Sequence, residues 1–302
     1  MKAQKLFSLA VVGLSFASGL FLSSCTVKDT IYLQDVNVRG PVNQPPIHVN
    51  DNANGGDVSL NVHASGGNRQ LVEGHVDGSG SPNKYATRYM NLSWNLPKSY
   101  FGTDVDLTLS RGIALTLGFN YSTLEEESFL GGHAGLGLLF HGEAVSGRFD
   151  AGVHWQTLKY DAATVVERQV TSLFSSSSST DTFYFHDIGN STLFDYYFSL
   201  TLNSKKHDWP LNFFAQIAIS KQSLTNFQPS TQVEYGLFET HIIVDTRAKS
   251  SATFLMITPG IYVNVGSSTR LLAGVRVAKE TEIILGSPDI ILMPLLQFDL
   301  KL

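Results

Sequence analysis

The sequence predicts an all-β protein, an antiparallel, up-and-down transmembrane β-barrel. Three observations lead to this prediction. Apolar and polar side chains alternate with a period of two over segments of about ten residues, the connections between these segments alternate between short and long, and only 16% of the 302 residues are charged. Typical soluble domains contain about 25% charged residues. A β-rich chain with so few charges fits a barrel whose outer face contacts lipid.

The composition excludes several other classes of protein. A hydrophobic share of 43% excludes a disordered chain, a single cysteine excludes a disulfide scaffold, and the net charge of -5 excludes a basic nucleic-acid-binding protein. Beyond residues 1–24, no apolar run is long enough for a transmembrane helix. We therefore expect no nucleic acid among the partners, and any membrane crossing has to be made by strands.

Residues 1–24 predict a secretory signal peptide. Two lysines precede an apolar stretch from Leu6 to Leu22 that contains no charge, as in the basic and apolar regions of such signals. The stretch ends in the residues LSSC at 22–25, which resemble the bacterial lipobox. This resemblance implies that Cys25, the only cysteine of the chain, carries lipid, becomes the first residue of the mature protein and anchors it in the outer membrane.

Residues 25–83 predict a lipidated, flexible tether. From Asn37 to Asn83 the chain is rich in Gly, Pro, Asn and Ser, so that it can bury little apolar surface. The predicted domain organisation is therefore a signal peptide at 1–24, a tether at 25–83 and a barrel at 84–302.

The barrel region shows the alternation most clearly in its last segment. Leu296, Phe298 and Leu300 alternate with Gln297 and Asp299, so one face is apolar and the other polar. Similar segments occur throughout the region. The ten predicted strands lie at 85–96, 100–110, 113–121, 133–141, 148–158, 194–202, 211–220, 253–265, 270–278 and 296–302.

The number of strands depends on the stretch Asp104–Tyr121, since barrels formed by one bacterial chain have even strand counts. If Ser110-Arg111-Gly112 forms a tight turn, the barrel has ten strands. If the stretch forms one strand, Tyr85–Leu96 lies outside and eight strands remain. We favour ten.

The connections predict which end of the barrel faces which compartment. Those at 143–147, 204–209 and 266–269 are short, whereas 160–190 and 221–251 are long and polar. Outer-membrane barrels have short periplasmic turns and longer extracellular loops. We therefore expect the C-terminal strand to end in the periplasm and the long loops to face outward.

The alternation also predicts which charged side chains point into the lumen. We expect opposite charges there to neutralise each other and to cross-link the strands; a narrow pore or ligand site is the alternative, although ten strands enclose little space when open channels need about 16. The predicted lumen residues are Asp106, Arg148, Asp150, His154, Asp195, Arg276, Asp299 and Lys301.

Two further patterns are candidates for chemical sites. His133, His141 and His154 share the inward parity, which fits hydrogen bonding in the lumen better than a metal site. His186 and Ser191 resemble the His and Ser of small lipid A deacylase barrels, but four residues lie between them, where that family has one. We therefore predict no catalytic residues, no metal and no cofactor.

Residues 84–302 resemble the outer-membrane β-barrel families of the Bacteroidota in strand spacing, aromatic content and the alternating C-terminal strand. With the lipobox, this resemblance implies a lipid-anchored outer-membrane barrel that contacts outer-membrane lipids. We expect a structural or complex-forming role with other outer-membrane proteins, through the loops and the tether. The alternatives are a narrow channel, a lipid-modifying enzyme and a soluble lipoprotein binding module of the β-sandwich type.

Overall fold

The structure is a computed structural model that describes residues 25–49, 54–67, 71–77, 89–172, 178–204, 211–223, 239–245, 251–281 and 290–302. The predicted signal peptide at 1–24 lies outside the described residues. Within the described residues there is no helix long and apolar enough to cross a membrane.

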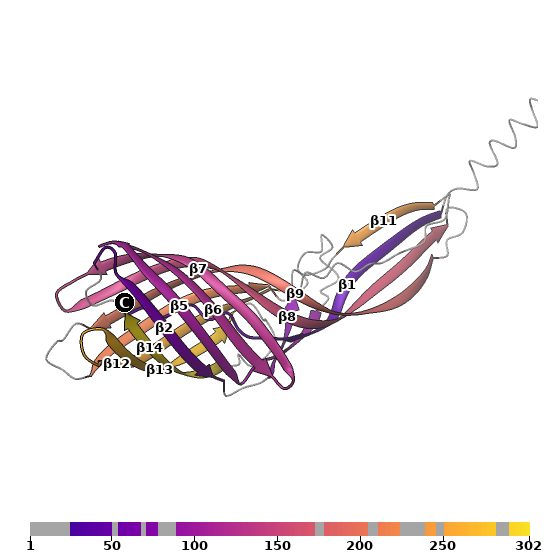
Figure 1. Ribbon diagram of the computed structural model, residues 1–302. Coiled ribbons are helices and arrows are strands. Elements are labelled where there is room, and N and C mark those ends of the chain that lie inside the picture. Colours follow the sequence, from indigo (N-terminus) through magenta and orange to yellow (C-terminus); the bar gives the residue numbers. More distant parts are fainter. Residues whose placement is uncertain are drawn as a thin grey trace, which may run out of the picture.

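Ten strands form a closed antiparallel barrel (Figure 1). Each strand pairs with the next barrel strand along the chain, and the last, β14, pairs with the first, β2. The prediction of a ten-stranded up-and-down barrel is confirmed, and a β-sandwich is excluded because the sheet has no open edges between these strands. The barrel strands are β2 (Val58–Gly66), β5 (Ser99–Ser110), β6 (Ile113–Leu124), β7 (Glu127–His141), β8 (Val145–Ser172), β9 (Ser178–Ser204), β10 (Asn212–Ser223), β12 (Ser251–Asn264), β13 (Thr269–Glu280) and β14 (Ile290–Lys301).

The first barrel strand differs from the prediction. Arg111 and Gly112 form the expected tight turn, but the strand within the predicted segment at 85–96, β4 (Tyr89–Asn95), pairs outside the barrel wall. Its place is taken by β2, which lies inside the predicted tether. Val58, Leu60 and Val62 do alternate with polar side chains, but a strand of nine residues between Gly- and Asn-rich segments is a weak signal.

An extension of the same sheet, which we call the arm, projects from one end of the barrel (Figure 1). Its core is the outer part of β8 and β9, which stay paired without interruption as far as Thr171 and Ser178. The strand β1 (Cys25–Arg39) pairs antiparallel with β8, while β11 (Glu239–Asp245) and β4 pair parallel with β1. The strand β3 (Leu71–Asp77) pairs with β4.

The arm corrects two predictions. The connection at 160–190 consists largely of paired strands, since both of its flanks carry β-branched and aromatic residues that extend the barrel hairpin in register. The prediction of a flexible tether at 25–83 is wrong for its described part, because this part contains β1, β2 and β3. Main-chain pairing with distant strands orders it despite its Gly- and Pro-rich composition.

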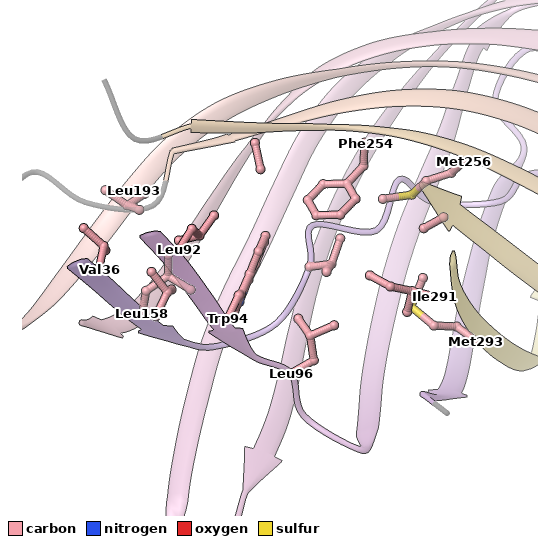
Figure 2. Packing of buried hydrophobic residues seen from close by; sticks show 14 of the residues in the cluster. Val36, Leu92, Trp94, Leu96, Leu158, Leu193, Phe254, Met256, Ile291 and Met293 are labelled. Atoms are coloured by element: carbon pink, nitrogen blue, oxygen red, sulfur yellow. The ribbon is translucent and has the colours of Figure 1, made fainter. Parts of the chain in front are cut away.

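Apolar side chains fill the barrel where the arm joins it, a group we call the mouth core (Figure 2). Trp94 of β4 is fully buried there, and its ring meets Phe254 of β12 edge-on at a centroid distance of 5.4 Å. Met256 and Met293 approach from the barrel wall, and Leu158 from the base of the arm. This end of the lumen is therefore packed with hydrocarbon.

The outer face of the barrel is apolar. Leu117, Leu136, Ile217 and Leu296 each expose about half of their surface, 52–57%, while their sequence neighbours Thr116, Gln216 and Gln297 are buried. A belt of exposed aliphatic and aromatic side chains around a closed barrel is the pattern of a strand-built membrane protein.

Candidate functional site in the barrel lumen

The lumen contains part of the chain itself. Residues 40–49, which we call the plug, have no regular secondary structure and are almost entirely buried. Gly40 begins the plug at a φ of 152°, a conformation that favours glycine. A Cβ atom at this position would lie 2.2 Å from a methyl group of Leu158. Glycine therefore suits the turn of the chain from β1 into the barrel, close to the wall.

Side chains of the wall satisfy the main chain of the plug. Its three prolines have no N–H donor, and their carbonyl groups need partners once they are removed from water. Four glutamines and two arginines, all on inward positions, donate to carbonyls of the plug. The pairs are Gln156 with Pro41 (2.5 Å), Gln222 with Pro41 (2.9 Å), Arg276 with Pro45 (2.8 Å), Gln216 with Pro46 (2.6 Å), Gln297 with Ile47 (2.8 Å) and Arg270 with Val49.

The polar side chains of the plug also bond to the wall. The Oε1 atom of Gln44 accepts hydrogen bonds from Ser65 and Arg276, each at 3.0 Å. The two ring nitrogens of His48 lie 3.3 Å from Asn61 and 3.4 Å from Thr116. The plug is thus bonded to several strands at once, which holds it in one position.

Apolar residues at the end of the plug pack against the wall. Ile47 and Val49 belong to a buried cluster with Phe214, Tyr262, Leu272 and Leu295. With the mouth core at the opposite end, the plug is enclosed by apolar packing at both ends and by hydrogen bonds between them.

A buried charge network lies beside the plug. The Arg148 guanidinium is fully buried and donates to Asp150 at 2.6 Å, to Asp106 at 2.7 Å and to Thr116 at 2.6 Å. Thr116 in turn donates to Asp106 at 2.8 Å. These bonds join β5, β6 and β8, so the network cross-links strands of the wall.

A second buried group contains histidines. His133 Nε2 lies 3.2 Å from one oxygen of Asp104, and His63 Nδ1 lies 3.5 Å from the other. The distances are those of ion pairs, although neither contact has hydrogen-bond geometry. His154 stacks at a tilt on Tyr197, with ring centroids 4.5 Å apart. His133 was predicted to point into the lumen, whereas His63 and Asp104 were not predicted.

The predicted lumen residues lie as follows. Seven of the eight are buried, with exposed fractions of 0–9%: Asp106, Arg148, Asp150, His154, Asp195, Arg276 and Asp299. Lys301 is the exception, since 44% of its side chain is exposed and it binds Asp57 at 2.6 Å at the barrel rim. Its position at the last residue of β14 places it beyond the enclosed part of the lumen.

The candidate metal and enzyme patterns are not assembled. The rings of His133 and His154 are 6.2 Å apart, while His141 is exposed at the end of β7. The described residues contain no group of three or more His, Cys, Asp or Glu side chains that could hold a metal ion. His186 and Ser191 lie on opposite faces of β9 about 16 Å apart, at about 3.3 Å per residue, so they cannot act as a pair.

The plug and the glutamines that hold it were not predicted from the sequence. A signal was present in the sequence, because four glutamines occupy inward positions: Gln156, Gln216, Gln222 and Gln297. Uncharged hydrogen-bond donors on the inner face of the wall indicate that acceptors lie inside the lumen. The segment PVNQPPIHV at 41–49 supplies carbonyls with few N–H groups, and the two features are complementary.

Comparison with known proteins gives only distant structural likenesses. No family model matches the chain, and no curated protein matches it. The N-terminal β-barrel domain of Pseudomonas aeruginosa OprF is 9% identical, with a TM-score of 0.29, covering 81% of this chain and 97% of that one.

Two further solved structures are similarly distant. The translocator domain of the autotransporter NalP from Neisseria meningitidis is 12% identical with a TM-score of 0.33, covering 83% of this chain and 91% of that one. LpxR from Salmonella typhimurium is 8% identical with a TM-score of 0.29, covering 80% of this chain and 99% of that one.

Proposed function

We propose that the protein is a non-conducting outer-membrane barrel, anchored by lipid on Cys25, that holds its arm in place as a scaffold for complexes with other outer-membrane proteins. The plug carries this proposal. A lumen whose inward glutamines and Arg276 are already bonded to the chain's own carbonyls has no free path for a solute. The apolar mouth core adds a second barrier.

The outer face supports placement in the outer membrane. Its exposed apolar belt needs lipid rather than water, so outer-membrane lipids are the proposed surroundings of the barrel. The lipobox at residues 22–25 supports the anchor. The arm is the part that extends beyond the barrel, and it supplies the surface for partner proteins.

A non-enzymatic role is supported by the chemistry of the lumen. The buried Arg148 guanidinium is bonded to two carboxylates and a hydroxyl, which favours a structural function over catalysis. His186, the histidine of the deacylase-like pattern, is instead bound to Asp161 at 2.9 Å on the exposed arm.

Conductance measurements test the plugged lumen. The purified protein should produce no discrete current steps in a planar bilayer of outer-membrane lipids. A variant in which residues 41–49 are replaced by a Gly-Ser segment of equal length, and Trp94 of the mouth core by alanine, should conduct, because the wall glutamines then face water and the second barrier is opened. Replacement of Ser267 and Ser268, in a turn outside the lumen, by glycines is the matched control. Regular current steps from the unaltered protein contradict the proposal.

Mass spectrometry tests the anchor. The N-terminal tryptic peptide, which should begin at Cys25 and end at Lys28, should carry the mass of a diacylglyceryl group. The Cys25→Ala variant should remain unprocessed. A processed N-terminal peptide with an unmodified Cys25 contradicts lipid anchoring, and it leaves the conductance result unaffected.

A further inference from the structure

The direction of β1 determines where the N-terminal segment begins. Cys25 pairs with Ser172, at the far end of β8, whereas Arg39 pairs with Lys159, close to the barrel. The chain therefore runs from the tip of the arm toward the barrel over about 45 Å, at about 3.3 Å per residue.

The plug then crosses the lumen in one direction. On β10, Gln222 contacts Pro41 and Gln216 contacts Pro46, and residue 222 is nearer the arm because β10 ends at that side. The strand β14 shows the same order, since Met293 contacts Gln44 and Gln297 contacts Ile47.

A third strand confirms the direction. On β13, Arg276 bonds to Pro45 and Arg270 bonds to the carbonyl of Val49, and Arg270 lies next to the start of β13, the end remote from the arm. Three strands of the wall thus place successive residues of the plug at successive depths.

The chain leaves the lumen at the rim opposite the arm. Gly56 donates to the carbonyl of Thr108 at 2.7 Å, and Asp57 binds Lys301, so β2 enters the wall from this rim. The turns at 111–112, 142–144 and 265–268 belong to the same rim. In outer-membrane barrels the rim with short turns faces the periplasm and the opposite rim faces outward.

We infer that the chain passes through its own barrel and displays β1, with Cys25 at its start, on the extracellular side. The segment that carries the proposed lipid is thereby outside the cell, while the strand that follows the plug starts in the periplasm. This placement goes beyond the proposed function, because it concerns sidedness and does not depend on conductance.

Threading also constrains assembly. The plug is bonded to β2, β8, β10, β13 and β14, and the mouth core covers it on the arm side. A closed barrel offers no route for the arm strand β1 to pass through afterwards. The wall therefore closes around the plug, with the N-terminal segment already on the arm side.

Labelling of intact cells with a membrane-impermeant maleimide tests the sidedness. Three exposed residues serve as labelling sites: Gln34 of β1, Thr182 of β9 and Ser267 of a short turn. Because these side chains are exposed, variants in which one of them is replaced by cysteine should fold. Gln34→Cys and Thr182→Cys should react on intact cells, and Ser267→Cys only after the outer membrane is permeabilised. The unsubstituted protein measures any background from Cys25.

Each result decides the inference. Labelling of Ser267→Cys but not Gln34→Cys on intact cells overturns the orientation, and labelling of Thr182→Cys without Gln34→Cys overturns the threading. Failure here leaves the conductance test of the plugged lumen intact, so the two proposals fail separately.

Cross-linking tests the threading independently. Gln44→Cys with Met293→Cys should be joined by a short bifunctional maleimide, because Nε2 of Gln44 lies 3.4 Å from Sδ of Met293. Trypsin should then release one linked peptide pair. Gln44→Cys with Leu302→Cys, at the opposite rim, is the matched control and should stay unlinked. A correctly assembled, heat-resistant barrel without the first link overturns the inference.

Discussion

Replacing Arg148 by methionine should destabilise the barrel strongly. The guanidinium is fully buried and binds Asp106 and Asp150 at 2.7 and 2.6 Å. Arg148→Met fills a similar volume but leaves two carboxylates in the lumen without their cation. Removing one partner of a buried ion pair costs about 3–5 kcal/mol.

This cost predicts a large shift in a urea titration. Because about 1.4 kcal/mol changes an equilibrium constant tenfold, the ratio of folded to unfolded protein should fall by roughly two to four orders of magnitude. At a slope of about 2 kcal/mol per M in urea, the unfolding midpoint should fall by about 1.5–2.5 M. The assay is urea unfolding in detergent micelles, followed by the heat-sensitive migration of the folded barrel on a gel.

Two variants control the experiment. Lys301→Met removes an exposed ion pair with Asp57, which should contribute only about 0–1 kcal/mol. Arg148→Met combined with Asp106→Asn and Asp150→Asn should recover much of the loss, because no uncompensated charge remains. The reasoning is refuted if Arg148→Met unfolds at the same urea concentration as Lys301→Met.

Three further changes probe other parts of the structure. Leu296→Arg, in the middle of β14 on the lipid face, should cost about 2–4 kcal/mol and reduce insertion into vesicles, whereas Leu302→Arg near the rim should cost about 0–1 kcal/mol; equal effects would contradict the assigned depth. Trp94→Ala should cost about 3–5 kcal/mol and make the arm more sensitive to protease, and unchanged digestion would argue against the mouth core. The Lys301 ammonium lowers the pKa of Asp57 through their hydrogen bond, so Lys301→Met should raise that pKa in an NMR titration, and an unchanged pKa would mean that the bond does not form.

Gln297 illustrates how the plug changes the expectations for the wall. The alternation of β14 alone makes Gln297 a lumen position where a longer polar side chain finds water. The structure places Ile47 and Asp299 against its amide, at 2.8 and 2.7 Å, so an arginine there has to displace the plug. Gln297→Arg is therefore a plug variant rather than a tolerated control for Leu296→Arg.

The alternation of side chains was sufficient to predict the barrel wall. In a strand with one face toward lipid and one toward the lumen, exposed and buried side chains alternate with a period of two. Leu296 and Gln297 could therefore be assigned to opposite faces from the sequence alone. The tight turn at Arg111 and Gly112 was also predictable, because it is set by adjacent residues. Nine of the ten barrel strands overlap segments found in this way.

The plug, the arm and the first strand depend on partners far away in the sequence. Residues 41–49 have no period of their own because their hydrogen bonds are made by side chains as distant as Gln297. The strand β1 is ordered by β8, more than 100 residues later, and by parallel pairing with β4 and β11. A Pro- and Gly-rich composition predicts flexibility for a segment without bonding partners. Hydrogen bonds to distant strands offset the entropy lost when the chain is ordered, and the composition does not reveal those strands. Local propensity therefore determined the wall, and long-range contacts determined what the wall encloses.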